Sequence, residues 1–297
     1  MPRTPVEPLK VEEIKLFESS KGQGRDTNDS KNKRREKILL DSYNGLTTVF
    51  FQDPTYGSQW QALATQLKEA VKQLMKSEGP FTLKAKGGRS NNSDFELSDG
   101  TKKINLEFKF GGKSVDSIPE FFNPAADKAF HPEFYARFFH QKYLGKLAEL
   151  YGLTDVPSEP IYMKEIHKNS SKNTFFKSFY DKDDLKSPLY KQKRDVVAAS
   201  ITEFLTLYKD KTNLEILTAE LQRSQENKHF LLYEDGKFYH DEIKASELIA
   251  DSILPIRNGN LLVIQMKEPG TKIEMLLRWK NRLGILFPAW QISMIRK

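Results

Sequence analysis

One stretch, residues 82–112, constrains the fold of this chain more than any other. It contains two runs of alternating polar and apolar residues on either side of the pair Asp99-Gly100. An Asp-Gly pair between two such runs is a strong signal for a β-hairpin, because the tightest hairpin turns need positive φ angles that these residues tolerate. The sequence therefore predicts two antiparallel strands that are joined at Asp99-Gly100, either by these two residues alone or by a four-residue loop from Ser98 to Thr101, which gives the same register.

The predicted hairpin has one polar face and one apolar face. With the turn at the Asp-Gly pair, Asn92 lies opposite Glu107, and Asp94 is a diagonal neighbour of Glu107 on the same face. Lys109 points to this face as well, because strand side chains alternate with a period of two. Diagonal neighbours lie roughly 7–8 Å apart, so long side chains there can share a ligand. The other face is apolar and consists of Phe95, Leu97, Leu106, Phe108 and Phe110.

Two carboxylates and a lysine on one face of a sheet suit metal chemistry. Asp94 and Glu107 offer hard oxygen ligands, and Mg²⁺ in proteins is typically bound by one or two carboxylates, several waters and substrate phosphates. Such an ion lowers the pKa of a bound water and neutralises charge on a phosphodiester. Lys109 would orient that water or stabilise charge on the phosphate. The alternative is that these residues are only the solvated face of a hairpin whose other face is dry.

The pattern Asp94 followed by Glu107-x-Lys109 resembles the signature of the PD-(D/E)xK nuclease superfamily, which includes type II restriction enzymes and many repair and viral nucleases. The motif is only three residues long and occurs often by chance. Ser93 stands where the family often has a proline. The resemblance implies that Asp94 and Glu107 bind a metal ion, Mg²⁺ or Mn²⁺, and that all three motif residues are catalytic.

The order of elements around the motif is also similar to that family, whose core is a helix, three antiparallel strands, a helix and a further strand. Here a helix-like stretch at 58–77 precedes a strand-like stretch at 81–86, the hairpin and a helix-like stretch at 131–151. The resemblance covers roughly residues 58–170.

Many members of the family carry an acidic residue on the first helix that joins the metal site. In the stretch 58–77 the only acid is Glu69. At about 100° per residue it falls opposite the apolar stripe, so we interpret Glu69 as solvated and leave this role unassigned. The stripe consists of Trp60, Leu63, Leu67, Val71 and Leu74.

The resemblance implies a nuclease that hydrolyses phosphodiester bonds, with DNA as the favoured substrate and endonuclease action. Restriction-type enzymes are often dimers, so a homodimer is implied too, although nothing in the sequence displays a dimer face. Two alternatives stay open. An RNA endonuclease of the cap-snatching type has a similar core, but such enzymes usually carry a histidine on the early helices, and no histidine precedes His131. A basic nucleic-acid-binding protein without catalysis is the other.

Positive charge is the second indication of a nucleic-acid partner. The chain has 47 lysines and arginines and a formal net charge of +7, which favours an anionic partner, most simply nucleic acid, although a basic protein can also be merely soluble. The resemblance implies that this nucleic acid is double-stranded DNA. Lys86, Arg89 and Lys113 flank the predicted site and are the expected nucleic-acid-binding residues. The simpler alternative for Arg89 is an ordinary loop.

Composition excludes several classes of protein. Hydrophobic residues make up 38% of the chain and aromatic residues 11%, which is enough for a folded core. The absence of cysteine excludes disulfides and thiolate zinc sites. No segment resembles a signal peptide, and no apolar run approaches the roughly 18 residues of a membrane span. We therefore expect a soluble intracellular protein, cytoplasmic or nuclear, with no membrane partner.

The predicted fold class is mixed α/β, of the α+β kind, with a restriction-endonuclease-like core and a β-rich C-terminal part. Residues 1–40 are expected to form a flexible basic arm. Residues 41–210 would be the nuclease-like core domain, and residues 211–297 a C-terminal subdomain that grips substrate. Local patterns in the second half predict helices at 187–207, 214–226 and 246–254, a hairpin at 230–239, and strands at 261–267, 273–280 and 285–295.

The five histidines are interpreted as helix-cap and surface residues rather than metal ligands. His131 and His140 are not four residues apart, as two ligands on one helix face would be, and no acidic partner stands out for them. The same interpretation applies to His167, His229 and His240.

Overall fold

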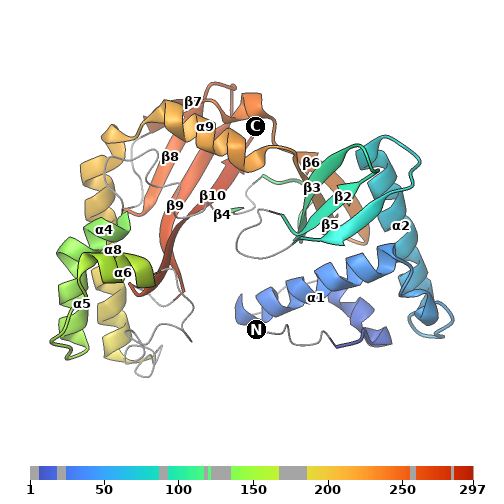
Figure 1. Cartoon of the computed structure of the whole chain (residues 1–297), viewed down its shortest axis with the longest axis horizontal. Coiled ribbons are helices and arrows are strands. Elements are labelled where there is room, and N and C mark those ends of the chain that lie inside the picture. The colour runs from blue at the N-terminus through green and yellow to red at the C-terminus, as the bar shows by residue number, and fades with distance from the viewer. Residues whose placement is uncertain are drawn as a thin grey trace. The chain divides into compact units, whose positions relative to one another are not determined.

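The structure is a computed structural model that describes residues 7–18, 25–86, 93–116, 120–121, 135–166, 186–254, 259–281 and 284–296. The chain forms two compact units, each built from two segments (Figure 1). The first unit comprises Met1–Val115 and Gln225–Ile243, and the second comprises Asp116–Ser224 and Lys244–Lys297. Helices and two sheets make the fold α+β with a β-rich C-terminal part, as the sequence predicts.

The first unit contains a five-stranded sheet in the order β1-β2-β3-β5-β6. Its strands are β1 (Thr82–Ala85), β2 (Phe95–Ser98), β3 (Lys103–Phe110), β5 (Lys228–Glu234) and β6 (Lys237–Glu242). The strands β1, β2 and β3 form an antiparallel meander. Strand β5 then pairs in parallel with β3, and β6 closes a hairpin with β5. The helix and three antiparallel strands of the expected core are therefore present in order.

The loop of the hairpin of β2 and β3 lies one residue later in the chain than the predicted four-residue loop from Ser98 to Thr101. Ser98 pairs with Lys103, so the loop has four residues that begin at Asp99. The Asp99 carboxylate accepts hydrogen bonds from the backbone N–H groups of Thr101 and Lys102, at 2.9 and 2.7 Å, which fixes this loop. The predicted register is wrong by two residues. Because the shift is even, every side chain keeps its predicted face.

The described residues of the first unit include four helical segments: η1 (Val11–Phe17), α1 (Arg25–Tyr43), η2 (Thr48–Phe50) and α2 (Gly57–Met75). The apolar stripe predicted on α2 is buried throughout. Glu69 on the other side of α2 is 57% exposed, which confirms that it is solvated. Helix α2 thus covers the apolar face of the hairpin, where its stripe and the hairpin phenylalanines share one core.

The predicted flexible arm at 1–40 is wrong for the described residues. Ile14, Phe17, Ile38 and Leu39 are buried in the core that α2 and the hairpin share. Arg35 is only 2% exposed, its guanidinium lies 3.7 Å from the centre of the Phe110 ring, and its Nε donates to the Leu16 carbonyl at 2.6 Å. The basic residue Arg35 of α1 therefore belongs to the folded unit. Its helix is held against the core because Ile38 and Leu39 are buried there.

The second unit contains an antiparallel sheet in the order β4-β10-β9-β8-β7. Its strands are β4 (Glu120–Phe121), β7 (Ala250–Leu254), β8 (Leu261–Met266), β9 (Lys272–Asn281) and β10 (Leu286–Ile295). Three of them match the predicted C-terminal strands. The helix predicted at 246–254 is wrong: a short 3₁₀-helix, η7 (Ala245–Leu248), is followed by β7, because pairing of β7 with β8 overrides the weak local helix signal.

Helices accompany this second sheet: α4 (Tyr135–Phe139), the π-helical turn η4 (His140–Leu144), α5 (Gly145–Leu150), α6 (Glu159–Glu165), α8 (Pro188–Tyr208), η6 (Lys209–Lys211) and α9 (Leu214–Gln225). An aromatic cluster holds α4 and α8 to β9: Tyr135 and Phe139 contact Trp279, and Phe204 contacts Tyr135. These rings are buried and pack edge to face.

The division into units differs from the boundaries at residues 40 and 210 that the sequence predicts. Strands β5 and β6 return to the sheet of the first unit after a long excursion of the chain. The helices at 135–150, expected beside the hairpin, belong to the second unit instead. Within the described part of the chain, no helix is both long enough and apolar enough to span a bilayer.

Candidate functional site

The backbone of β3 holds the Asp94 carboxylate in place. Asp94 directly precedes β2, and its N–H donates to the Leu106 carbonyl at 3.1 Å, which continues the strand pairing. The N–H of Phe108 donates to Asp94 Oδ2 at 2.9 Å. Continuation of the observed register places Asp94 directly opposite Glu107, rather than diagonal to it. The structure thus brings these two acids closer along the sheet than the sequence predicts.

The carboxylate of Glu107 lies between two lysines. Lys109, two residues further along β3, donates from Nζ to Glu107 Oε1 at 2.7 Å. Lys228 on β5 places its Nζ 3.7 Å from Oε2 of the same carboxylate. The side chain of Glu107 is 14% exposed and that of Lys228 only 2%. Water screens the attraction between these two largely buried charges only weakly, so the Lys228 ammonium acts on the Glu107 carboxylate at this distance.

The sequence alone does not predict Lys228 at this site, because pairing between strands that are distant in the chain brings it there. In the parallel register of β3 and β5, Lys228 is opposite Asn105, and Glu107 is opposite Phe230. The Lys228 ammonium also lies 5.1 Å from the centre of the Phe230 ring. The predicted hairpin at 230–239 supplies β5 itself, but no local signal tells which strand β5 pairs with or in which direction.

A third acid, Glu36 on α1, belongs to the same electrostatic environment. Burial first, and then the negative charges of Asp94 and Glu107, raise the pKa of Glu36 to about 7, against the opposing effect of Lys33 and Lys109. Repulsion of this kind requires that the three carboxylates lie near one another. The sequence pattern offers an acid on the predicted helix at 58–77, whereas Glu36 lies one helix earlier. The sequence feature that indicates a buried position for Glu36 is the apolar pair Ile38-Leu39 just after it.

The three carboxylates form an open group rather than a tight one. Ligand atoms of three donors lie within 4.8 Å of one another at one place among the described residues. That place holds two histidines and a glutamate elsewhere in the unit, not these three acids. Like charges repel without a cation between them, and Glu107 is drawn toward its two lysines.

The donor set nevertheless fits a hard divalent cation. All three acids offer oxygen ligands, which Mg²⁺ and Mn²⁺ prefer. The raised pKa of Glu36 reflects burial together with the nearby negative charges of Asp94 and Glu107, which a divalent cation would offset. In that case Asp94, Glu107 and Glu36 would bind the ion, and Lys109 would stay beside it.

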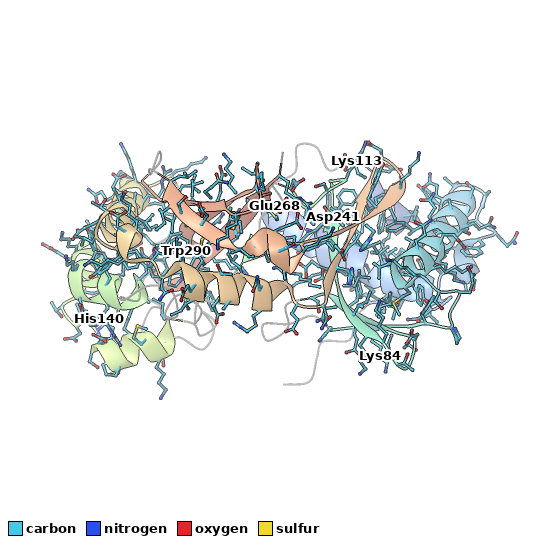
Figure 2. All side chains as sticks on the ribbon, turned by 90° about the horizontal axis from the view of Figure 1, so that it is seen from above. Lys84, Lys113, His140, Asp241, Glu268 and Trp290 are labelled. Atoms are coloured by element: carbon cyan, nitrogen blue, oxygen red, sulfur yellow. The ribbon has the colours of Figure 1, made fainter. Side chains whose placement is uncertain are left out.

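The expected nucleic-acid-binding residues have different surroundings. Lys86, just beyond β1, donates from Nζ to Asn105 Oδ1 at 2.8 Å, so it lies on the polar face of the sheet. Lys113 is 57% exposed, 3.2 Å from the Asp235 carboxylate and 5.9 Å from the centre of the Tyr239 ring (Figure 2). Arg89 and Asn92 lie outside the described residues.

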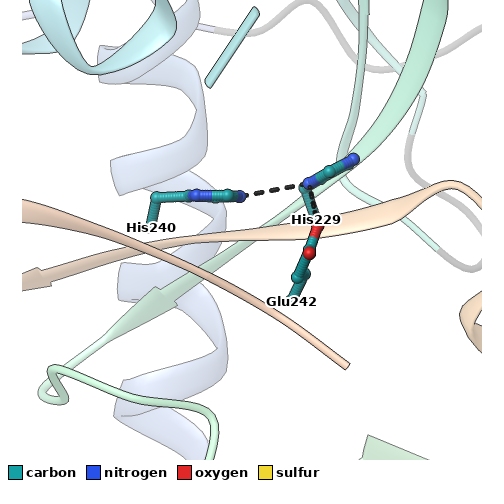
Figure 3. Close-up of side chains that lie close together, drawn as sticks. All are labelled: His229, His240 and Glu242. Carbon is teal, nitrogen blue, oxygen red and sulfur yellow. Dashed lines mark hydrogen bonds and ion pairs between the residues drawn. The ribbon is translucent and has the colours of Figure 1, made fainter. Parts of the chain in front are cut away.

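Two histidines come together away from these acids. His229 on β5 and His240 on β6 lie side by side, next to Glu242 (Figure 3). His140 in the second unit instead bonds through Nε2 to the Pro157 carbonyl at 2.8 Å. His131 and His167 lie outside the described residues.

Comparison with known proteins adds no relative: no protein-family model matches the chain, and no curated protein matches its sequence.

Proposed function

We propose that the chain is a divalent-metal-dependent nuclease that hydrolyses phosphodiester bonds, acting as an endonuclease on DNA. The observation that carries the proposal is that Asp94 lies opposite Glu107, beside Lys109, on the polar face of one sheet, and Glu36 of α1 is near enough for their charges to raise its pKa. The proposal also rests on the likeness of Asp94 and Glu107-x-Lys109 to the nuclease signature and on the helix and three antiparallel strands around them.

Each residue has a role that follows from its chemistry. Asp94 and Glu107 are the metal ligands, and Glu36 is a third acid on the same side. A bound Mg²⁺ or Mn²⁺ supplies Lewis acidity and a water of lowered pKa. Lys109 carries its ammonium next to Glu107, where it would orient the attacking water or stabilise charge on the phosphate.

Double-stranded DNA is the proposed partner, met in the cytoplasm or the nucleus and bound by a homodimer. The formal net charge of +7 favours an anionic polymer. Lys86, Arg89 and Lys113 are the proposed backbone contacts, because point charges near a site neutralise phosphates without reading sequence.

The test is cleavage of plasmid DNA and of single-stranded RNA by the full-length chain, with Mg²⁺, Mn²⁺ or EDTA. Lys109→Ala and Glu107→Gln are compared with wild type. We expect each variant to lose at least about two orders of magnitude in rate, or about 2.7 kcal/mol of transition-state stabilisation. EDTA should abolish cleavage.

The first unit offers matched controls away from the acids. Lys103 on β3 is 67% exposed, and Glu69 on α2 is 57% exposed. Lys103→Ala and Glu69→Gln remove the same kinds of charge and should leave the rate within about twofold, because exposed charges contribute little. Equal losses in the control and site variants would show that the effect is general and not local to the site.

Two other results would redirect the proposal. Cleavage of RNA alone would favour the RNA endonuclease of the cap-snatching type. If neither substrate is cut with any metal, yet the chain retards DNA in a salt-dependent way that Glu107→Gln leaves unchanged, the protein is a non-catalytic nucleic-acid-binding protein.

A further inference from the structure

The hairpin of β5 and β6 brings two imidazoles and a carboxylate to one face of the sheet. His229 pairs directly with Glu242, and His240 pairs with Leu231, so His240 is the diagonal neighbour of His229. Directly paired residues share a face, as do residues two apart on one strand, so all three side chains point the same way. They converge from two neighbouring strands, one of which, β6, is an edge strand of its sheet.

The ligand atoms are already close to a metal-binding arrangement. His229 Nδ1 lies 3.1 Å from His240 Nε2 and 3.4 Å from Glu242 Oε2 (Figure 3). Donors around a tetrahedral Zn²⁺, at about 2.0–2.1 Å from the ion, are about 3.3 Å from one another. The three atoms all lie within 4.8 Å of one another. The remaining adjustment falls on Glu242, whose side chain is 44% exposed and has room to rotate.

The surroundings of the two imidazoles favour their neutral form, which is the form that binds metal. Burial lowers the pKa of His229, and the neighbouring His240 and Lys102 lower it further, against an opposing effect of Glu242. Burial also lowers the pKa of His240, with a smaller contribution from Lys76, while Glu242 and Asp241 act in the opposite direction.

We propose that His229, His240 and Glu242 form a zinc site that joins the strands β5 and β6. Two imidazoles and one carboxylate are a donor set that zinc accepts, with water in the fourth position. Zinc suits this set better than Mg²⁺, which prefers oxygen ligands in an octahedron. The site is therefore chemically distinct from the acids around Asp94. Its effect would be to hold the edge strand β6 onto the sheet, since the ion links side chains of both strands.

The ordinary alternative is a hydrogen bond between two neutral histidines. A separation of 3.1 Å between ring nitrogens suits such a bond when one ring donates and the other accepts. Glu242 would then be a solvated neighbour. This alternative makes no demand on metal, so the two explanations differ in what the protein binds.

The experiment measures Zn²⁺ binding by the metal-free, full-length chain in competition with a chromogenic chelator. Wild type is compared with His240→Ala and Glu242→Gln. We expect one Zn²⁺ per chain at this site, and a loss of at least about tenfold in affinity in each variant, since even loss of an outer-shell partner of a metal typically costs 10–100-fold. Co²⁺, which reports coordination in its visible spectrum, should give an intense four-coordinate spectrum with wild type alone.

Two controls separate this site from other metal binding. His140→Ala removes a histidine of the second unit that bonds to a backbone carbonyl, and Glu107→Gln removes a proposed ligand of the other cation. Neither should change Zn²⁺ affinity. His240 and Glu242 are partly open to water, so circular dichroism should show that both site variants fold.

Two results would overturn the proposal. One is a wild-type affinity equal to that of His240→Ala and Glu242→Gln, and the other is a Co²⁺ spectrum of the weak six-coordinate kind. Either would leave the pair as a histidine–histidine hydrogen bond. Because the assay does not involve nucleic acid, its outcome is independent of the proposed nuclease activity.

Discussion

The N–H of Phe108 donates to the carboxylate of Asp94 at 2.9 Å. Phe108 lies between Glu107 and Lys109, so one short piece of β3 carries two of the proposed catalytic side chains and also orients the third. A carboxylate that accepts a backbone hydrogen bond has fewer orientations to lose when it binds an ion. The spacing of the signature is thus supported by a direct contact across the hairpin.

The first prediction separates the charge of Asp94 from its hydrogen bond. Asp94→Asn keeps an oxygen that can accept from Phe108, so its thermal midpoint should stay near that of wild type, while cleavage falls by at least about a hundredfold, or 2.7 kcal/mol. Asp94→Ala removes the acceptor as well and should cost about 1 kcal/mol more in stability. Cleavage and thermal unfolding are measured on the same samples. Equal unfolding of the two variants would contradict the role of the contact.

The second prediction concerns the dependence of stability on pH. Burial, then repulsion by Asp94 and Glu107, raises the pKa of Glu36 from 4.5 to about 7. Between these values the folded chain holds a proton on Glu36 that the unfolded chain has lost, so the contribution of Glu36 to the free energy of unfolding in EDTA falls as pH rises from about 4.5 to about 7. Above that window the contribution of Glu36 is constant. His229 and His240, whose pKa values burial lowers, contribute in the opposite direction. Urea unfolding at a series of pH values measures the slope.

Two variants test the assignment of this slope to Glu36. The side chain that Glu36→Gln introduces stays neutral, so the free energy of unfolding of this variant should fall less than that of wild type between about pH 5 and about pH 8. Glu69→Gln, which changes a solvated acid on α2, should follow wild type. Mg²⁺ should recover stability in wild type at the higher pH and less in Glu36→Gln. Parallel slopes for all three proteins would exclude Glu36 as the group responsible.

Much of the first unit follows from local patterns. The apolar stripe of α2 and the alternation along residues 82–112 are spaced by the geometry of the helix and the strand, so both elements and both faces could be predicted. The register was wrong because the position of the loop depends on hydrogen bonds of Asp99 that the Asp-Gly signal does not determine. The polar face was still predicted correctly because the register differs by two residues, an even number.

The rest of the site depends on tertiary contacts. Glu36 reaches the acids because α1 packs into the core, and Lys228 does so because β5 pairs in parallel with β3. The local sequence predicts neither the packing of α1 nor the pairing of β5 with β3. The His229–His240 pair is different, since the turn at Asp235-Gly236 of the hairpin predicted at 230–239 places these residues diagonally across it. Helical spacing does not detect that relation, because it runs between two strands.

The third prediction tests whether the basic segment of α1 is part of the fold. Arg35→Ala removes the contact with Phe110 and the hydrogen bond to the Leu16 carbonyl, so the free energy of unfolding should fall by about 2 kcal/mol. Lys68→Ala on α2 changes an exposed cation and should stay within about 0.5 kcal/mol of wild type. Urea unfolding measures both. An unchanged midpoint for Arg35→Ala would mean that α1 contributes little to the stability of the unit.

The last prediction concerns competition for the Glu107 carboxylate. Lys228 keeps a buried positive charge 3.7 Å from Glu107 Oε2, where it opposes the entry of a divalent cation. Lys228→Met keeps the apolar stem and removes the charge, so the Mg²⁺ concentration for half-maximal cleavage should fall severalfold. Lys103→Met, at the exposed end of β3, should leave that concentration unchanged. A higher Mg²⁺ requirement in Lys228→Met would show instead that the lysine positions Glu107 for the ion, because its loss would then weaken the site.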